Sequence, residues 1–168
     1  LHSMVVTAAG RVLTFGWGMS GQLGHGDTQQ QTRPKLVAAL ESESVVSVAA
    51  GDAHSMALTS GGALYNWGGN DYGQLGHGED AVGNNQLVPK RVAALADEEV
   101  VAMSAGDAHT MAVTATGKAY DWGYGEDGRL GHGDGEQQHT PKVVAALEGE
   151  RVVGVSAGWT HSLFVTAC

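Results

Sequence analysis

One four-residue motif, Leu-Gly-His-Gly, occurs three times in this chain. The copies lie at 23–26, 75–78 and 130–133, so successive copies are 52 and 55 residues apart. A second motif, histidine followed by Ser or Thr and then Met or Leu, keeps the same phase and begins at His2, His54, His109 and His161. A repeat of this length indicates a row of similar supersecondary units, each of which buries its apolar face against its neighbours.

Within one repeat the sequence predicts four short strands. Residues 54–59 alternate as a half-buried strand does, the glycines that follow permit a tight turn, and residues 63–67 return. A third apolar segment is expected at 91–95 and a fourth strand at 100–105. The Ala-Ala-Leu part of the third segment is also compatible with one turn of helix, although so short a helix is weakly stable alone. Four short strands in a repeat of this length are typical of a propeller blade, so we expect an all-β chain.

A glycine-rich loop at 68–78 separates the second and third segments, and its glycines exclude a regular helix or strand there. We expect the Gly-His pairs of the repeated motif to be structural, with each histidine fixing a loop by hydrogen bonds. Two tryptophans end the second strand of their repeats, and we expect both in the core. The predicted structural positions are Gly24, His25, Gly76, His77, Gly131, His132, Trp67 and Trp122.

These positions together resemble the regulator-of-chromosome-condensation (RCC1-type) repeat. The resemblance rests on Trp67-Gly68, the Gly-Gln-Leu-Gly-His-Gly run at 73–78, Pro89, the segment 101–106 and His109-Thr110. The local sequence is similar to repeats of plant ultraviolet-B receptors and of ubiquitin-ligase-associated members of the family.

The resemblance implies a seven-bladed β-propeller whose blades are four antiparallel strands. This chain would supply one partial propeller domain. We expect repeats at 1–53, 54–108 and 109–160, followed by the first strand of a fourth repeat at 161–168. Because the chain starts at a repeat marker and not at Met, we expect a trimmed or partly observed protein.

The charge balance argues against several classes of partner. The chain has 18 acidic and 9 basic residues and a formal net charge of −9. No basic stripe or tail is visible, so we expect no direct binding to nucleic acid, and no apolar run is long enough for membrane insertion. The single cysteine, Cys168, cannot form a disulfide within the chain. This favours an intracellular, reducing compartment, and cytoplasm, nucleus and organelle matrix stay open.

Familiar catalytic and metal-binding patterns are missing from the sequence. Seven of the eight histidines occupy repeat positions, which lie far apart on successive blades and so cannot share one metal ion. The sequence contains no H-E-x-x-H, G-x-S-x-G or paired-cysteine motif. We therefore expect no enzyme active site, no cofactor and no metal.

The most informative variation among the repeats is the residue after Ala-Gly, which is Asp52, Asp107 and then Trp159. Equivalent loops on successive blades share one rim, where we expect partner proteins to bind. The acidic clusters before each fourth strand, at 41–43, 97–99 and 148–150, are expected to be solvated, with docking of a basic partner as the alternative. The candidate partner-binding residues at the rim are Asp52, His54, Asp107, His109, Trp159, His161 and Trp17.

Three functions remain open at this point. The leading hypothesis is a non-enzymatic protein-interaction scaffold, which is a subunit of a larger assembly. The resemblance implies a second, because Gly-Asp-x-His loops in the family contribute acidic groups to guanine-nucleotide exchange on a small GTPase, and Asp52 and Asp107 match them. It implies a third through Trp159, because 158–162 is similar to the tryptophan-bearing loops at the dimer interface of plant ultraviolet-B receptors.

Overall fold

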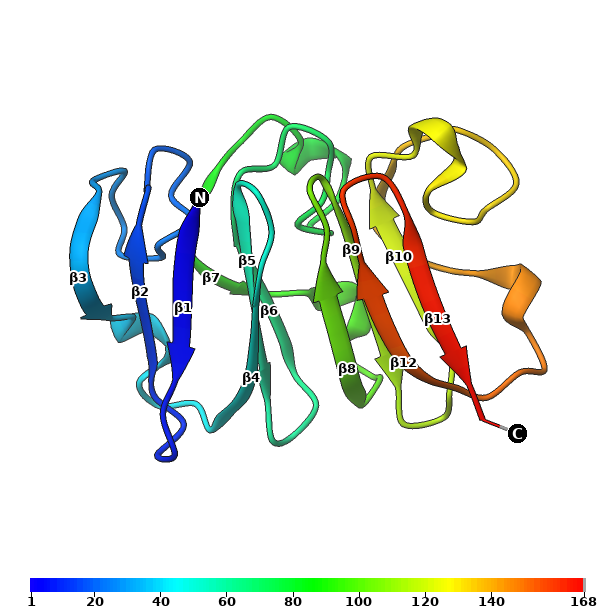
Figure 1. The fold of residues 1–168 in the computed structure, drawn as a ribbon, viewed down its shortest axis with the longest axis horizontal. Coiled ribbons are helices and arrows are strands. Elements are labelled where there is room, and N and C mark those ends of the chain that lie inside the picture. The colour runs from blue at the N-terminus through cyan, green and yellow to red at the C-terminus, as the bar shows by residue number, and fades with distance from the viewer. Residues whose placement is uncertain (168) are drawn as a thin grey trace.

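The computed structural model describes residues 1–167, and this part of the chain consists of thirteen β-strands and five single-turn 3-10 helices. The strands form four antiparallel sheets that lie side by side in chain order (Figure 1). The first sheet contains β1 (His2–Val6), β2 (Val12–Gly16) and β3 (Gln31–Leu36), and the second contains β4 (Val45–Ala50), β5 (His54–Thr59), β6 (Leu64–Gly68) and β7 (Gln86–Arg91). The third sheet contains β8 (Val100–Ala105), β9 (His109–Thr114), β10 (Ala119–Gly123) and β11 (Gln138–Val143). The fourth sheet contains β12 (Val152–Ala157) and β13 (Ser162–Thr166).

The second and third sheets confirm the predicted class: all-β, with blades of four antiparallel strands. Each blade begins with a strand from the end of one sequence repeat and takes its other three strands from the next repeat. The first strands, β4, β8 and β12, contact one another from sheet to sheet. They are therefore the inner strands, and β3, β7 and β11 are the outer edges.

The third segment of each repeat differs from the prediction. The strand expected at 91–95 lies earlier, at β7 (Gln86–Arg91), and Ala93–Leu95 forms the single 3-10 turn η3, which is the alternative of one helical turn. The third strand was predicted to begin after Pro89, whereas Pro89 lies inside β7. An outer strand tolerates proline, since the missing N–H faces away from the sheet. The turn itself is held by Leu95, which is buried.

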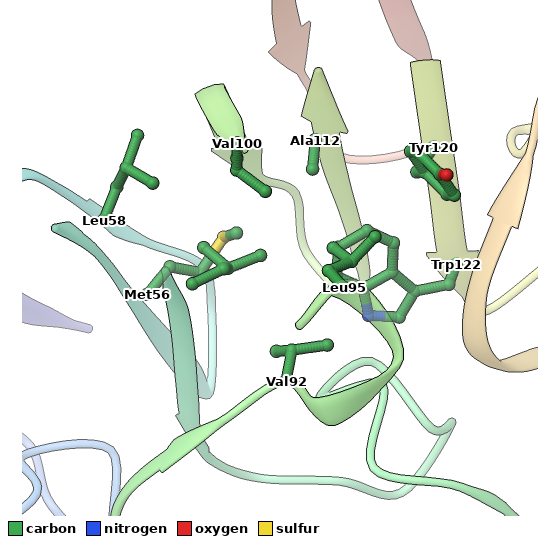
Figure 2. Close-up of a cluster of buried hydrophobic side chains, with 9 residues drawn as sticks. Met56, Leu58, Val92, Leu95, Val100, Ala112, Tyr120 and Trp122 are labelled. Atoms are coloured by element: carbon green, nitrogen blue, oxygen red, sulfur yellow. The ribbon is translucent and has the colours of Figure 1, made fainter. Parts of the chain in front are cut away.

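The hydrophobic core lies between the sheets. Figure 2 shows one cluster to which β5 contributes Met56 and Leu58, while the next sheet contributes Ala112 and Trp122. Leu64 of β6 belongs to the same cluster. Each sheet thus buries its apolar face only by packing against its neighbour, as expected for stacked repeats.

A tryptophan clamp ties each blade to the glycine-rich loop of the blade before it. Nε1 of Trp67 donates a 2.9 Å hydrogen bond to the carbonyl oxygen of Gln22, and Nε1 of Trp122 donates one of 3.0 Å to that of Gln74. Both indoles are fully buried. A Cβ added to Gly76 would lie 2.7 Å from Nε1 of Trp122, so this indole requires a glycine in the repeated motif.

Candidate functional site

Three equivalent loops, 51–53, 106–108 and 158–161, form the surface that we call the rim. Each connects an inner strand to the next strand outward, so all three lie at one end of the sheets, the upper end in Figure 1. They surround a shallow cavity of about 240 Å³, which is lined by Asp52, Asp107 and Trp159 together with the glycines before them. The structure therefore brings together the equivalent positions of three repeats, which are Asp, Asp and Trp.

The glycines of the rim allow the loops to touch. A Cβ added to Gly51 would lie 2.6 Å from Nδ1 of its own loop's His54 and 2.5 Å from the carbonyl oxygen of Gly106 on the next blade. A Cβ on Gly106 would in turn lie 2.8 Å from the carbonyl oxygen of Gly158. A side chain at any of these positions would force the blades apart, so the rim has a fixed shape set by backbone packing.

The residue that follows each of these glycines faces solvent to a different degree. Asp52 is exposed, Asp107 is half-buried, and 75% of the surface of Trp159 is accessible. Among residues 1–167, the ion pairs present involve neither of the two aspartates. The rim thus presents two free carboxylates beside an indole, which is a combination that can bind a polar, positively charged group.

The rim histidines do not all lie where the sequence analysis placed them. His54 and His109 are fully buried below the loops, so in this structure they offer no surface to a partner. Each ring packs on the glycine three residues before it and contacts a hydroxyl of the next blade, Thr110 for His54 and Ser162 for His109. His161 is exposed. Trp17 lies half-buried in the loop after β2, outside the cavity.

The buried histidines instead connect successive blades. Nε2 of His54 lies 3.0 Å from Oγ1 of Thr110, which donates its proton to the carbonyl oxygen of Gln74 at 2.8 Å. Because the hydroxyl has a single proton, the histidine must donate at Nε2, which fixes its tautomer. His2 makes the same link with Ser55, at 2.6 Å, and the hydroxyl of Ser55 donates to the carbonyl oxygen of Gln22 at 2.7 Å.

Burial keeps these histidines uncharged. Removal from water lowers the pKa of His54 to about 3, and lowers the pKa values of His2 and His109 to about 4. Nδ1 of each of the three rings is buried without a partner among the described residues. A neutral ring with a single N–H donor fits this environment, so the histidines serve the packing of the blades.

The sequence analysis missed a second group of residues at the same end. The rings of Tyr72 and Tyr124 lie 4.4 Å apart, and Cζ of Arg129 lies 4.6 Å from the centre of the Tyr124 ring. Arg129 is nearly buried and donates from Nη1 to the carbonyl oxygen of Trp159 at 3.3 Å. One signal was available: arginine replaces glutamine in the third Gly-Gln-Leu-Gly-His-Gly run.

The predicted structural positions lie away from the cavity. Nε2 of His77 is 3.3 Å from the carbonyl oxygen of Asn66, and Nε2 of His132 is 3.0 Å from that of Asp121. Nε2 of His25 instead contacts Oγ1 of Thr14 at 3.0 Å. All three histidines fix the glycine-rich loop to the second strand of the same repeat. Gly24 and Gly76 are buried, whereas Gly131 is exposed.

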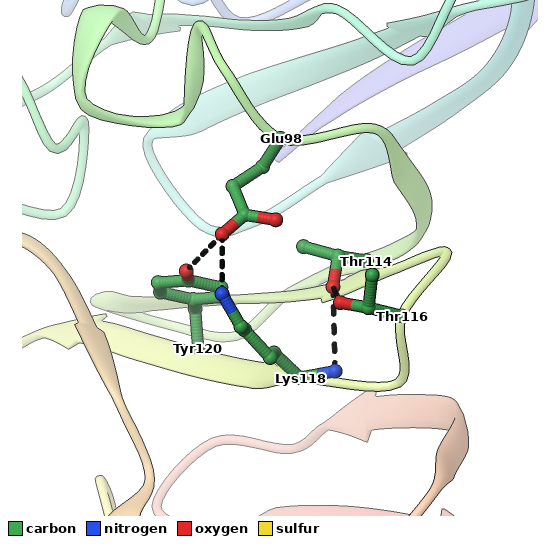
Figure 3. A network of polar contacts seen from close by, with 5 residues as sticks. All are labelled: Glu98, Thr114, Thr116, Lys118 and Tyr120. Carbon is green, nitrogen blue, oxygen red and sulfur yellow. Dashed lines mark hydrogen bonds and ion pairs between the residues drawn. The ribbon is translucent and has the colours of Figure 1, made fainter.

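The acidic clusters lie at the opposite end of the sheets, which we call the hairpin end. Glu98 accepts hydrogen bonds from Lys118 at 2.8 Å and from the hydroxyl of Tyr120 at 3.0 Å (Figure 3). Glu43 accepts one from Tyr65 in the same way, at 3.0 Å. These two acids therefore have structural partners, while Glu41, Glu99, Glu148 and Glu150 are exposed.

Residues 1–167 contain neither a metal-binding cluster nor a membrane-spanning helix. This part of the chain holds no group of three or more His, Cys, Asp or Glu side chains placed to bind a metal ion. None of its helices is long and apolar enough to cross a membrane. Cys168, on which the expectation of a reducing compartment rests, lies outside the described residues.

Comparison with known proteins agrees with the repeat pattern. The model of the RCC1-like domain matches residues 1–164. The chain belongs to this family. Among its relatives, the human E3 ubiquitin-protein ligase HERC2 is 40% identical over 98% of the chain, and the ultraviolet-B receptor UVR8 of Arabidopsis thaliana is 38% identical over the same share.

Solved RCC1-type structures share the fold. The structure of Prp20p from Saccharomyces cerevisiae, a protein whose binding to Gsp1p and histones was studied with it, superposes with a TM-score of 0.89 at 25% identity over 99% of this chain. The RCC1-like chain spans 3% of HERC2, 37% of UVR8 and 42% of Prp20p. It therefore covers less than half the length of each of these relatives.

Proposed function

We propose that this RCC1-like chain is a non-enzymatic protein-interaction module that binds partner proteins at the rim. The observation that carries the proposal is the convergence of Asp52, Asp107 and Trp159 around one shallow cavity on a rigid frame. Exposed tryptophan surrounded by polar groups is typical of the residues that dominate binding energy at protein interfaces. Within this function the chain acts as one subunit or segment of a larger assembly.

Comparative affinity purification with matched charge variants tests the proposal. The double variant Asp52→Asn and Asp107→Asn changes the rim, and Glu41→Gln with Glu150→Gln makes the same charge change at the hairpin end. We expect the rim variant to lose bound proteins that both the unchanged chain and the hairpin-end variant retain. Equal loss from both variants, or loss from the hairpin-end variant alone, would refute binding at the rim.

Guanine-nucleotide exchange on a small GTPase is the second candidate. It is favoured by the similarity to Prp20p and by the Gly-Asp-x-His sequence of two rim loops. Its mechanism would be differential binding, in which the rim binds the nucleotide-free GTPase more tightly than the nucleotide-bound form. Release of a fluorescent guanine nucleotide from the GTPase, measured with the unchanged chain and with Asp107→Asn, tests it. Release at the intrinsic rate with both proteins would exclude exchange.

Light reception fits the rim less well. This chain is related to UVR8, but only one of the three equivalent rim positions is a tryptophan, Trp159. Aspartates occupy the other two. Thr160 follows Trp159, where the receptor-type loops that the sequence resembles have arginine. A single tryptophan does not provide the cluster that such a receptor requires, so the proposal is protein binding.

A further inference from the structure

The negative charge of the chain is concentrated at one end of the sheets. The rim end consists of the rim and the loops that follow β2, β6 and β10, which are residues 17–30, 69–85 and 124–137. These loops contain ten of the eighteen acidic residues and one of the nine basic residues, so they account for the whole net charge of −9. The ten are Asp27, Asp52, Asp71, Glu79, Asp80, Asp107, Glu126, Asp127, Asp134 and Glu136.

The one basic residue of the rim end neutralises only one of them, because Nη2 of Arg129 lies 3.5 Å from Oδ2 of Asp127. The guanidinium of Arg129 has a side-chain exposure of 4% and is engaged with the carbonyl oxygens of Glu126, at 3.0 Å, and Trp159, at 3.3 Å. The remaining eight acidic and eight basic residues balance elsewhere in the chain. The rim end is therefore a one-sign surface, which attracts positively charged partners over distances of about a Debye length.

Aromatic side chains lie among these carboxylates. Trp159 is 75% exposed and Tyr72 is 38% exposed, and Tyr72 packs on the ring of Tyr124. The faces of indole and phenol rings attract arginine and lysine cations. Arg129 already uses one face of Tyr124 in this way, at 4.6 Å, which shows that the local geometry accommodates a guanidinium on a ring.

We propose that the rim end binds a lysine- or arginine-bearing segment of a partner protein, with one cationic side chain seated in the cavity between Trp159 and the carboxylates of Asp52 and Asp107. This inference rests on the proposed function and names the chemistry of the partner. A cavity of about 240 Å³ is large enough for one long side chain and too small for a folded element. Specificity would come from the contacts in this cavity, while the surrounding acidic loops would raise the association rate.

A second copy of this chain is a poor occupant for the same surface. The rim end of a second copy would present the same ten acidic residues and no exposed basic residue. Like charges facing each other across an interface oppose association. Two copies are therefore not expected to pair rim end to rim end, and the occupant must present positive charge.

Selection from a library of short random peptides, displayed on phage and panned against the complete chain, tests the inference. Bound peptides are counted as rim-dependent when Trp159→Ala abolishes their binding. We expect rim-dependent peptides to contain lysine or arginine. Replacing that residue by its neutral analogue, citrulline for arginine or acetyl-lysine for lysine, should weaken binding at least about tenfold. The double variant Asp52→Asn and Asp107→Asn should do the same, whereas Glu41→Gln with Glu150→Gln should not.

Every result bears on the inference. Rim-dependent peptides that lack a basic residue, or that bind equally well with citrulline, would overturn it and leave the rim as a protein-binding site of other chemistry. A selection that yields no rim-dependent peptide would also overturn it. Loss of basic peptides from the hairpin-end variant in place of the rim variant would overturn both the inference and the proposed function.

Discussion

Single residues of one blade contact the next blade in this molecule. Gly76 has a φ of +71° and lies against the indole of Trp122 from the next repeat. Gly128 has nearly the same φ, +69°, but a Cβ there would meet nothing within 4 Å. The two glycines thus separate the effect of backbone conformation from the effect of packing.

Gly76→Ala should destabilise the fold by about 2 kcal/mol more than Gly128→Ala, because both variants strain the backbone but only the first displaces a buried indole. Denaturant unfolding, followed by tryptophan fluorescence, measures both. Equal losses of unfolding free energy would mean that the indole adapts to the added methyl group without cost.

Asp121 occupies a position where the other repeats have hydrogen-bond donors. Oγ1 of Thr14 donates to the carbonyl oxygen of Leu23 at 2.6 Å, and Nδ2 of Asn66 donates to that of Leu75 at 3.2 Å. Asp121 is fully buried, accepts a bond from Ser162 at 2.7 Å, and has one oxygen without a partner among the described residues. Burial raises the pKa of this carboxyl to about 8.

This raised pKa predicts that stability falls as the pH rises. The folded state keeps the proton of Asp121 up to about pH 8, whereas the unfolded chain releases it near its ordinary value of 3.8. Between about pH 6.5 and pH 8 the loss should be about 2 kcal/mol. Asp121→Asn should remove this dependence, since an amide cannot ionise and can donate as Asn66 does.

Urea unfolding of both proteins across this range measures the effect, with Asp127→Asn, a change to an exposed carboxylate, as the control. A wild-type stability that stays constant across the range would show that Asp121 is ionised in the folded protein.

At the scale of elements, the links between blades are made by buried neutral histidines and therefore depend on pH in the opposite direction. His2, His54 and His109 have folded-state pKa values of about 4, 3 and 4, below the ordinary 6.5. The unfolded chain takes up these protons first, so stability is lost as the pH falls below about 6.5.

Acidification from about pH 6.5 to pH 5 should cost about 2 kcal/mol for each of these histidines. The variant His54→Gln retains a donor for Thr110 but cannot be protonated. Its unfolding free energy should therefore decrease by about 2 kcal/mol less than that of the unchanged chain over the same range. Parallel loss in the two proteins would assign the acid sensitivity to other groups.

Sequence reasoning predicted the repeat, the four-stranded blade and the location of equivalent loops on one rim, because these depend on patterns that recur at fixed spacing. It placed the third strand too late, because Pro89 reads as a strand boundary when the edge position of β7 is unknown. It expected His54 and His109 at the surface, because the same motif cannot reveal which side of a loop a ring packs on. Sequence reasoning did not predict the group formed by Arg129, Tyr72 and Tyr124, since their contacts join loops that are distant in the sequence.

At the scale of the whole molecule, rigid blades carry a one-sign surface. The tryptophan clamps and histidine links fix each sheet to the next, and the glycines of the rim bring three loops into contact. Differences between repeats are then displayed on a constant frame, which is how a repeat protein acquires specificity. The rim combines free carboxylates with an exposed indole, whereas Glu43 and Glu98 at the hairpin end bind tyrosine hydroxyls of the chain itself.

Site-specific photo-crosslinking tests the central claim, that partners bind at the rim, most directly. A photoreactive amino acid is placed at Thr160, which is exposed beside Trp159, and in a second protein at Thr116, which is exposed in the hairpin after β9 at the opposite end. After irradiation in the native cell extract, mass spectrometry identifies the attached proteins. If partners bind at the rim, one reproducible partner is crosslinked from position 160 and none from position 116. The same partner crosslinked from position 116 alone would contradict binding at the rim.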